Sequence, residues 1–409
     1  MKVGIYIPGL GYGNGPVTLT TYAQNFARAL DKNDENKLSR YTVKFDKVVF
    51  DDVDQPQEFN VADIKRTMPG STGEETLYRF YGYDYENDFT EKMRNTNIFR
   101  KSLRLVWGFG KMAPVFLLSL LKRGQSAKQK MRSLYFFSVL ILFSVATALL
   151  IPSLVAVLTD NIPSIKQYVL SHMDRHGFCY ELAAKYKDFA HILVVFTSGM
   201  ALLSPRFQNL ITIASTEYLC VHYYLKYGEG KQTLIGDFSN LVEKVSEKEV
   251  GYTAFEVHAF SFGSIIAIDS LYPSNMQQAD LRTCTEITHF VTVGCPVDFV
   301  RVYYPNYFSE RKLVCTGIQD WYNINCEVDV LSSNFRNDSK RDDADPAVVP
   351  GGADVKNITY EVTPYKNVSW IDYLFLLGFK SHRMYWGEGP NGMSFFTNYI
   401  TRLRADKKF

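Results

Sequence analysis

Residues 256–269, Glu-Val-His-Ala-Phe-Ser-Phe-Gly-Ser-Ile-Ile-Ala-Ile-Asp, contain the serine best suited to chemistry, Ser261. A strand pattern runs up to Ser261 and a helix pattern follows it at once. Ala259 and Gly263, two residues to either side, are small enough for the crowded backbone of a sharp strand-to-helix turn. Such a turn exposes the hydroxyl, and the amino terminus of the helix stabilises developing negative charge. The pattern therefore predicts a nucleophilic serine.

These residues resemble the nucleophile elbow, G-x-S-x-G, of the α/β-hydrolase superfamily, with Ala259 in place of the first glycine. Alanine is the mildest replacement for glycine at that position. In this superfamily the catalytic residues follow the order serine, then aspartate or glutamate, then histidine. The resemblance covers residues 1–50 and 230–409 and implies a catalytic triad with Ser261 as its nucleophile.

Two histidines follow Ser261 in the chain, His289 and His382. His289 begins a predicted strand and precedes the better candidates for the acid, which is typical of a core or strand-end residue. His382 lies after the last predicted strand and before the final helix, in Ser-His-Arg-Met-Tyr-Trp (381–386). This wording resembles lipase-like hydrolases, which place the base there. We therefore expect His382 to be the base, with an ordinary loop histidine as the alternative interpretation.

Three carboxylates are candidates for the acid. The segment 321–331, Trp-Tyr-Asn-Ile-Asn-Cys-Glu-Val-Asp-Val-Leu, resembles the strand of lipase-like relatives that leads to the triad aspartate, and Asp329 occupies that position. Cys326 stands where the family segment often has an aspartate. Glu327, two residues before Asp329, and Asp298, after the preceding strand, are the alternatives. An acid here would orient the histidine ring and stabilise the imidazolium.

The resemblance also implies an oxyanion hole formed by the backbone N–H groups of Phe262 and Leu10. Residues 3–13, Val-Gly-Ile-Tyr-Ile-Pro-Gly-Leu-Gly-Tyr-Gly, resemble the strand and loop in which these enzymes place the second donor. Glycines there let the backbone approach a substrate oxygen closely. A nucleotide-binding loop is the rival interpretation, but Asn14 stands where a third glycine is needed and no Lys-Ser/Thr follows. No metal or organic cofactor is implied.

The elements that must position these residues alternate strands with helices at both ends of the chain. We expect strands at 2–7, 41–50, 252–260, 287–293, 321–326 and 358–362, and helices at 18–30, 233–248, 263–272, 370–379 and 393–403. Residues 51–97 are polar and aromatic-rich and predict no element. Such alternation predicts an α/β fold, a mainly parallel sheet flanked by helices of the α/β-hydrolase type.

The composition fits a large core and excludes few functions by itself. Apolar residues make up 46% of the chain, and 45 basic against 43 acidic residues leave a net charge of +2. A nucleic-acid-binding protein usually shows a basic excess or a basic stripe, so nucleic acid is not an expected partner. The six cysteines form no C-x-x-C pair, which favours a reducing compartment.

The middle of the chain has a different composition. Residues 133–159 contain no charged side chain, a run longer than the roughly 20 residues that span a bilayer. Residues 189–205 form a second such stretch, without Asp, Glu, Lys or Arg. Because both ends of the sheet must lie on one side of a membrane, the chain must cross an even number of times. The basic run 122–132 would then lie on the catalytic side, which the positive-inside rule makes cytoplasmic. A buried lid and a re-entrant segment are the alternatives.

These patterns together predict a membrane-attached serine hydrolase that cleaves carboxylic acyl esters of lipids through an acyl-enzyme on Ser261. Residues 1–100 would form the amino-terminal part of the hydrolase domain, 101–229 a helical membrane-associated insertion, and 230–409 the part with nucleophile, acid and base. A catalytically inactive hydrolase-fold scaffold or signalling protein at the membrane is the alternative. Two or three candidate spans without internal charge argue against a transporter or pore.

Overall fold

We describe the protein from a computed structural model. The described residues are 1–11, 15–34, 39–50, 56–68, 70, 73–96, 205–274, 286–309, 311, 317–326, 329–336, 344–345, 347–360, 382, 384–386 and 394–406, with scattered helical residues between 100 and 141. None of the helices formed by these residues has the length and apolar character needed to cross a membrane. The predicted spans 133–159 and 189–205 lie almost wholly outside the described residues, so membrane insertion stays a prediction.

Strands of the described part of the chain form one mixed sheet, in the order β2-β3-β4-β1-β5-β6-β7-β8. Their bounds are β1 (Lys2–Ile7), β2 (Arg40–Phe50), β3 (Gln57–Thr67), β4 (Glu74–Gly82), β5 (Phe255–Phe260), β6 (His289–Val293), β7 (Asp320–Asn325) and β8 (Val355–Thr359). From β4 to β8 all neighbours are parallel, whereas β2, β3 and β4 pair antiparallel at one edge. The prediction of an α/β fold with a mainly parallel sheet is confirmed.

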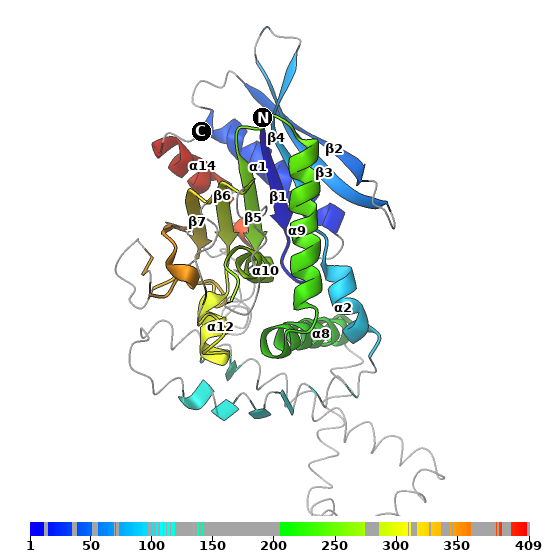
Figure 1. Ribbon diagram of the computed structural model, residues 1–409, viewed down its shortest axis with the longest axis vertical. Helices are drawn as coiled ribbons and strands as arrows, with labels where there is room; N and C mark the ends of the chain where they lie inside the picture. Colours follow the sequence, from blue (N-terminus) through cyan, green and yellow to red (C-terminus); the bar gives the residue numbers. More distant parts are fainter. Residues whose placement is uncertain are drawn as a thin grey trace, which may run out of the picture. The chain divides into compact units, whose positions relative to one another are not determined.

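Helices cover both faces of this sheet (Figure 1). The bounds are α1 (Gly15–Asn33), α2 (Glu86–Arg94), α8 (Pro205–Tyr227), α9 (Lys231–Lys248), α10 (Phe262–Leu271), α12 (Val297–Tyr303) and α14 (Phe395–Ala405), with short 3₁₀ turns η1 (Pro350–Gly352) and η3 (Met384–Trp386). Val3 and Ile5 of β1 pack with α9 and α10, while Tyr6 packs with α1 and α14. Alternate residues of a strand thus face two hydrophobic cores.

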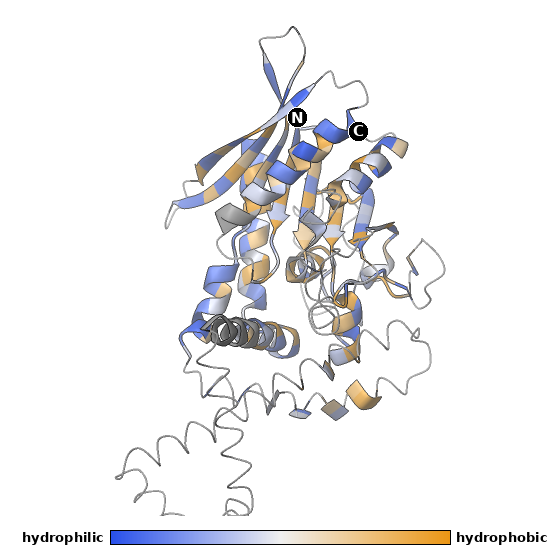
Figure 2. Ribbon diagram, turned by 180° about the vertical axis from the view of Figure 1, so that it is seen from behind, coloured by the Kyte–Doolittle hydropathy of each residue, from blue (hydrophilic) through white to orange (hydrophobic). Residues whose placement is uncertain are grey.

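The burial of the strands follows their position in the sheet. Every residue of β5, at its centre, is buried, because helices cover a parallel strand on both sides. At the edge, no residue of β2 is buried, and the strand contains both hydrophobic and charged residues (Figure 2). The strand that leads to Ser261 is therefore enclosed on both faces, as are β6 and β7, which gives the turn after it a rigid base.

Residues 51–97, which the sequence pattern left unassigned, contain β3, β4 and α2. Arg79 of β4 donates two hydrogen bonds to the Asp63 carboxylate of β3, at 2.7 and 2.9 Å. This pairing lets charged residues occupy neighbouring strands. The short helix α12 was also not predicted, and the predicted helix 370–379 lies outside the described residues.

The chain divides into two compact units. The first consists of residues 1–89, 118–135 and 221–409, and the second of residues 90–117 and 136–220. All strands of the sheet belong to the first unit. In the second, the rings of Phe116 and Phe137 stack with their centroids 4.1 Å apart.

Candidate active site

Ser261 lies between the last residue of β5 and the first residue of α10, with φ 52° and ψ −124°. A positive φ costs a residue with a Cβ about 1–3 kcal/mol, so the surrounding structure must hold it. The Ser261 N–H donates to the carbonyl of Val293 at the end of β6 (2.9 Å), and the Ser261 carbonyl accepts from the N–H of Ser264 (2.9 Å). The chain therefore makes a sharp, strained strand-to-helix turn at Ser261.

Glycines allow the close packing around this turn. A Cβ on Gly263 would lie 2.5 Å from the carbonyl oxygen of Pro8, and a Cβ on Gly9 would lie 2.8 Å from the Cβ of Ser261. Real side chains do not approach so closely, so α10 and the loop after β1 meet only because both positions are glycine. Ala259, at the position where the elbow pattern has its first glycine, is buried in β5.

His382 bridges Ser261 and Asp329. Its Nε2 lies 2.7 Å from Oγ of Ser261, and its Nδ1 lies 2.7 Å from Oδ2 of Asp329. Because an ionised carboxylate only accepts hydrogen bonds, Nδ1 carries the proton and Nε2 is left to accept from the serine hydroxyl. The imidazole stacks on Phe260 at a centroid distance of 5.1 Å. A Cβ on Gly294, where φ is 60°, would lie 3.0 Å from the imidazole, so this glycine leaves room for the ring.

Asp329 is fully buried, and its carboxylate is held from several sides. Oδ2 accepts from the hydroxyl of Tyr385 (2.9 Å) as well as from His382, and Oδ1 accepts from the N–H of Leu331 (2.9 Å). These bonds offset the cost of removing a charge from water. The sequence pattern assigned no role to Tyr385, although this residue belongs to the lipase-like wording of residues 381–386.

Asp298, one of the two alternative acids, does not share this arrangement. Asp298 lies in the first turn of α12, where its carboxylate is 3.9 Å from Arg301. Glu327 lies outside the described residues. Of the two candidates that the structure describes, Asp329 lies in hydrogen-bonding contact with His382.

The two predicted N–H donors flank the serine. Phe262 is the first residue of α10, and the first N–H groups of a helix have no acceptor within it. Leu10 follows Gly9, which packs against Ser261. Within the described residues the Leu10 N–H has no hydrogen-bond partner. The surroundings of Ser261 are therefore consistent with an oxyanion hole.

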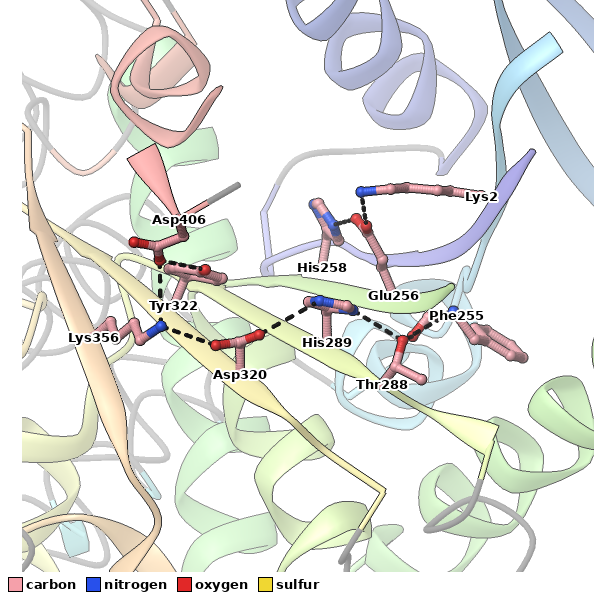
Figure 3. A network of polar contacts seen from close by, with 10 residues as sticks. All are labelled: Lys2, Phe255, Glu256, His258, Thr288, His289, Asp320, Tyr322, Lys356 and Asp406. Atoms are coloured by element: carbon pink, nitrogen blue, oxygen red, sulfur yellow. Dashed lines mark hydrogen bonds and ion pairs between the residues drawn. The ribbon is translucent and has the colours of Figure 1, made fainter. Parts of the chain in front are cut away.

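Two other buried histidines, His258 and His289, belong to a polar network nearer the amino ends of the strands (Figure 3). His289 lies 2.9 Å from the Thr288 hydroxyl and 3.5 Å from the Asp320 carboxylate. His258 Nε2 lies 2.9 Å from Glu256, which also pairs with Lys2 at 3.1 Å. These contacts match the expectation that His289 is a core or strand-end residue, and the network links neighbouring strands.

Glu256 is the most deeply buried charge of this network. Burial by itself would raise the pKa of Glu256, but the hydrogen bond from His258 and the charge of Lys2 outweigh burial and lower that pKa to about 2. Since the ordinary value is 4.5, folding favours the ionised carboxylate. The stabilisation is complete above pH 4.5 and is lost as the pH falls towards 2.

We therefore expect Glu256→Gln to unfold at a lower temperature than the wild type at pH 7, with a difference that shrinks between pH 4.5 and pH 2. Thermal unfolding measured at several pH values across this range checks the prediction. Glu58→Gln, which changes a half-exposed carboxylate on β3, is the matched control and should show a much smaller difference. A deficit of Glu256→Gln that stays constant with pH would contradict the prediction.

No family model, curated protein or solved structure matches this chain. Among the described residues, no group of three or more His, Cys, Asp or Glu side chains could hold a metal ion.

Proposed function

We propose that the protein is a serine hydrolase of the α/β-hydrolase type that cleaves carboxylic acyl esters. The observation that carries the proposal is the unbroken chain from Ser261 through His382 to Asp329, with both hydrogen bonds 2.7 Å long. It stands at the carboxyl end of a central parallel strand, where open α/β sheets bind ligands. A strained serine bonded to a buried histidine–carboxylate pair is the arrangement that activates a hydroxyl as a nucleophile.

The reaction would transfer a proton between Ser261 and His382, with Asp329 stabilising the charged imidazole. Oγ of Ser261 attacks the ester carbonyl and its proton passes to Nε2 of His382, while Asp329 stabilises the imidazolium. The N–H groups of Leu10 and Phe262 stabilise the oxyanion of the tetrahedral intermediate. His382 then protonates the leaving alkoxide, which leaves the acyl group on Ser261. A water molecule deprotonated by His382 attacks this acyl-enzyme, and the acid departs as the serine regains its proton.

Hydrolysis of p-nitrophenyl butyrate by the purified wild-type chain tests the proposal. We expect saturable turnover, and a fluorophosphonate should stop it after adding one adduct, located by mass spectrometry on the peptide that contains Ser261. An inactive scaffold, the alternative, would show neither turnover nor adduct. Absence of both across a series of short acyl esters would end the proposal.

Tyr385→Phe should lower kcat about tenfold, because hydrogen bonds to charged groups contribute about 1.5 kcal/mol or more. Phenylalanine keeps the buried ring and removes the hydroxyl that donates to Asp329. Tyr272→Phe, at a buried tyrosine of the other hydrophobic core, is the matched control and should leave kcat unchanged. Equal kcat values for Tyr385→Phe and the wild type would mean that this hydroxyl does not help to hold the acid.

We extend the proposal to a lipid substrate and to membrane attachment, with the catalytic residues on the cytoplasmic side. This extension rests on the sequence of residues 133–159 and 189–205, which is apolar and nearly free of charge over the length of a bilayer. An enzyme anchored in this way would meet its substrate at the membrane surface.

The full chain should remain in the membrane pellet after washing with alkaline carbonate, because a charge-free run of this length needs an apolar environment. A variant with residues 101–206 replaced by a short Gly/Ser linker should be recovered in the supernatant. Full-length protein recovered wholly in the supernatant would contradict membrane attachment. It would favour the alternative interpretation of the middle segment as a buried lid.

A further inference from the structure

Two consecutive residues at the start of α2, Tyr85 and Glu86, bond to the loop that follows β1. The buried hydroxyl of Tyr85 donates to the carbonyl oxygen of Pro8 at 3.0 Å. The N–H of Gly11 donates to Oε1 of Glu86 at 3.2 Å. These bonds join segments that are 77 and 75 residues apart in the chain.

The two bonds hold the peptide groups on either side of the Leu10 N–H. The Pro8 carbonyl belongs to the peptide before Gly9, and the Gly11 N–H belongs to the peptide after Leu10. Between them lies the single peptide that carries the Leu10 N–H. With both neighbouring peptides held, this planar peptide can change direction only by a concerted rotation of ψ at Gly9 and φ at Leu10, so the two bonds restrict the direction of its N–H.

The same helix also packs against the residue that carries the second proposed donor. Phe89, one turn after Tyr85, stacks on the ring of Phe262 with centroids 5.6 Å apart and an interplanar angle of 15°. Tyr224 of α8 meets the Phe262 ring edge-on at 5.1 Å. The start of α2 therefore contacts both segments that would form the oxyanion hole.

We propose that Glu86 is a positioning residue for the oxyanion hole: its carboxylate holds the Gly11 N–H and so directs the Leu10 N–H towards the substrate oxygen. Tyr85 acts in the same way through the Pro8 carbonyl. This inference rests on the proposed function of Ser261. Glu86 does not touch the substrate and acts only through the loop.

The test compares Glu86→Ala, Glu86→Gln and Asp88→Ala in the full-length chain. Loss of an oxyanion donor costs about 10²- to 10³-fold in kcat, so a donor that is present but misdirected should cost about tenfold. We expect Glu86→Ala to lower kcat on p-nitrophenyl butyrate about tenfold with KM unchanged. Glu86→Gln keeps an oxygen acceptor and should retain most of the activity. Asp88 is exposed in the same first turn, and its replacement controls for the loss of a charge at the helix terminus.

A second measurement separates positioning from a general structural effect. A short alkyl trifluoromethyl ketone adds to the serine and places an oxyanion in the hole, so its inhibition constant should weaken in Glu86→Ala by the same factor as kcat/KM. Unchanged kcat and unchanged inhibition in Glu86→Ala would overturn the inference, as would an equal loss in Asp88→Ala. In both cases the wild type would still hydrolyse the ester. A wild type without turnover or fluorophosphonate adduct would instead overturn the proposed function itself.

Discussion

Replacing Ser261 with alanine should lower ester hydrolysis by at least about 10⁴-fold and remove all fluorophosphonate labelling. The hydroxyl is the only group of this residue that His382 can activate, and the hydrogen bond of 2.7 Å between them has no substitute in the variant. Folding should be unaffected, because serine and alanine both carry a Cβ, so the substitution adds no strain to the positive φ of this residue. Thermal unfolding and labelling of the same preparation check both parts.

Ser264→Ala is the matched control, since Ser264 lies one turn further along α10. Its hydroxyl donates to the carbonyl of Ala259 at 2.9 Å, and its side chain is fully buried. Labelling and turnover should persist in this variant. A fluorophosphonate adduct that persists in Ser261→Ala, or that moves to Ser264, would contradict the assignment of Ser261 as nucleophile.

The turn at Ser261 could be predicted because the residues that mark it are close together in the sequence. A strand, a serine between Ala259 and Gly263, and an immediate helix lie within about ten residues of each other. This pattern is enough to recognise the turn, although its positive φ is also held by the bond to Val293 and by the packing of Gly9. His382 and Asp329 were harder to choose, because only their order in the chain and their place after predicted strands distinguished them.

The antiparallel edge of the sheet could not be predicted in the same way. Its strands β3 and β4 contain charged side chains within their central residues, and single-sequence patterns treat such segments as loops. Asp63 is tolerated there because Arg79 lies opposite on β4, and Glu249 completes the arrangement with a bond of 2.9 Å to the same guanidinium. The partner of a charge on a strand is set by tertiary contacts that no window of sequence contains.

The contacts of the loop after β1 were missed for a related reason. Its glycines indicated a close approach of the backbone to a substrate oxygen, but nothing near Leu10 in the sequence points to Tyr85 or Glu86. Both lie in the stretch that predicted no element. Side chains that bond to a distant loop, as those of Tyr85 and Glu86 do, leave no local pattern in the sequence, so the structure is needed to find them.

The choice of acid depends on where β7 ends. The strand stops at Asn325, and the N–H of Asp329 lies 3.2 Å from the carbonyl of Cys326. The Asp329 carboxylate lies 2.7 Å from Nδ1 of His382. The sequence did not decide between Glu327 and Asp329, because a strand that ended two residues earlier would place Glu327 at the position of the acid.

Asp329→Asn should therefore lower kcat about 10⁴-fold with little change in KM. An amide can present its NH₂ group to Nδ1 of the imidazole, which moves the ring proton to Nε2 and leaves no acceptor for the serine hydroxyl. Steady-state hydrolysis of p-nitrophenyl butyrate measures the loss, and Asp298→Asn and Glu327→Gln serve as controls that should stay within about threefold of the wild type. If Glu327→Gln proves to be the damaging change while Asp329→Asn is mild, the acid has been assigned two residues too late, and the bond between Asp329 and His382 is not the one that orients the base.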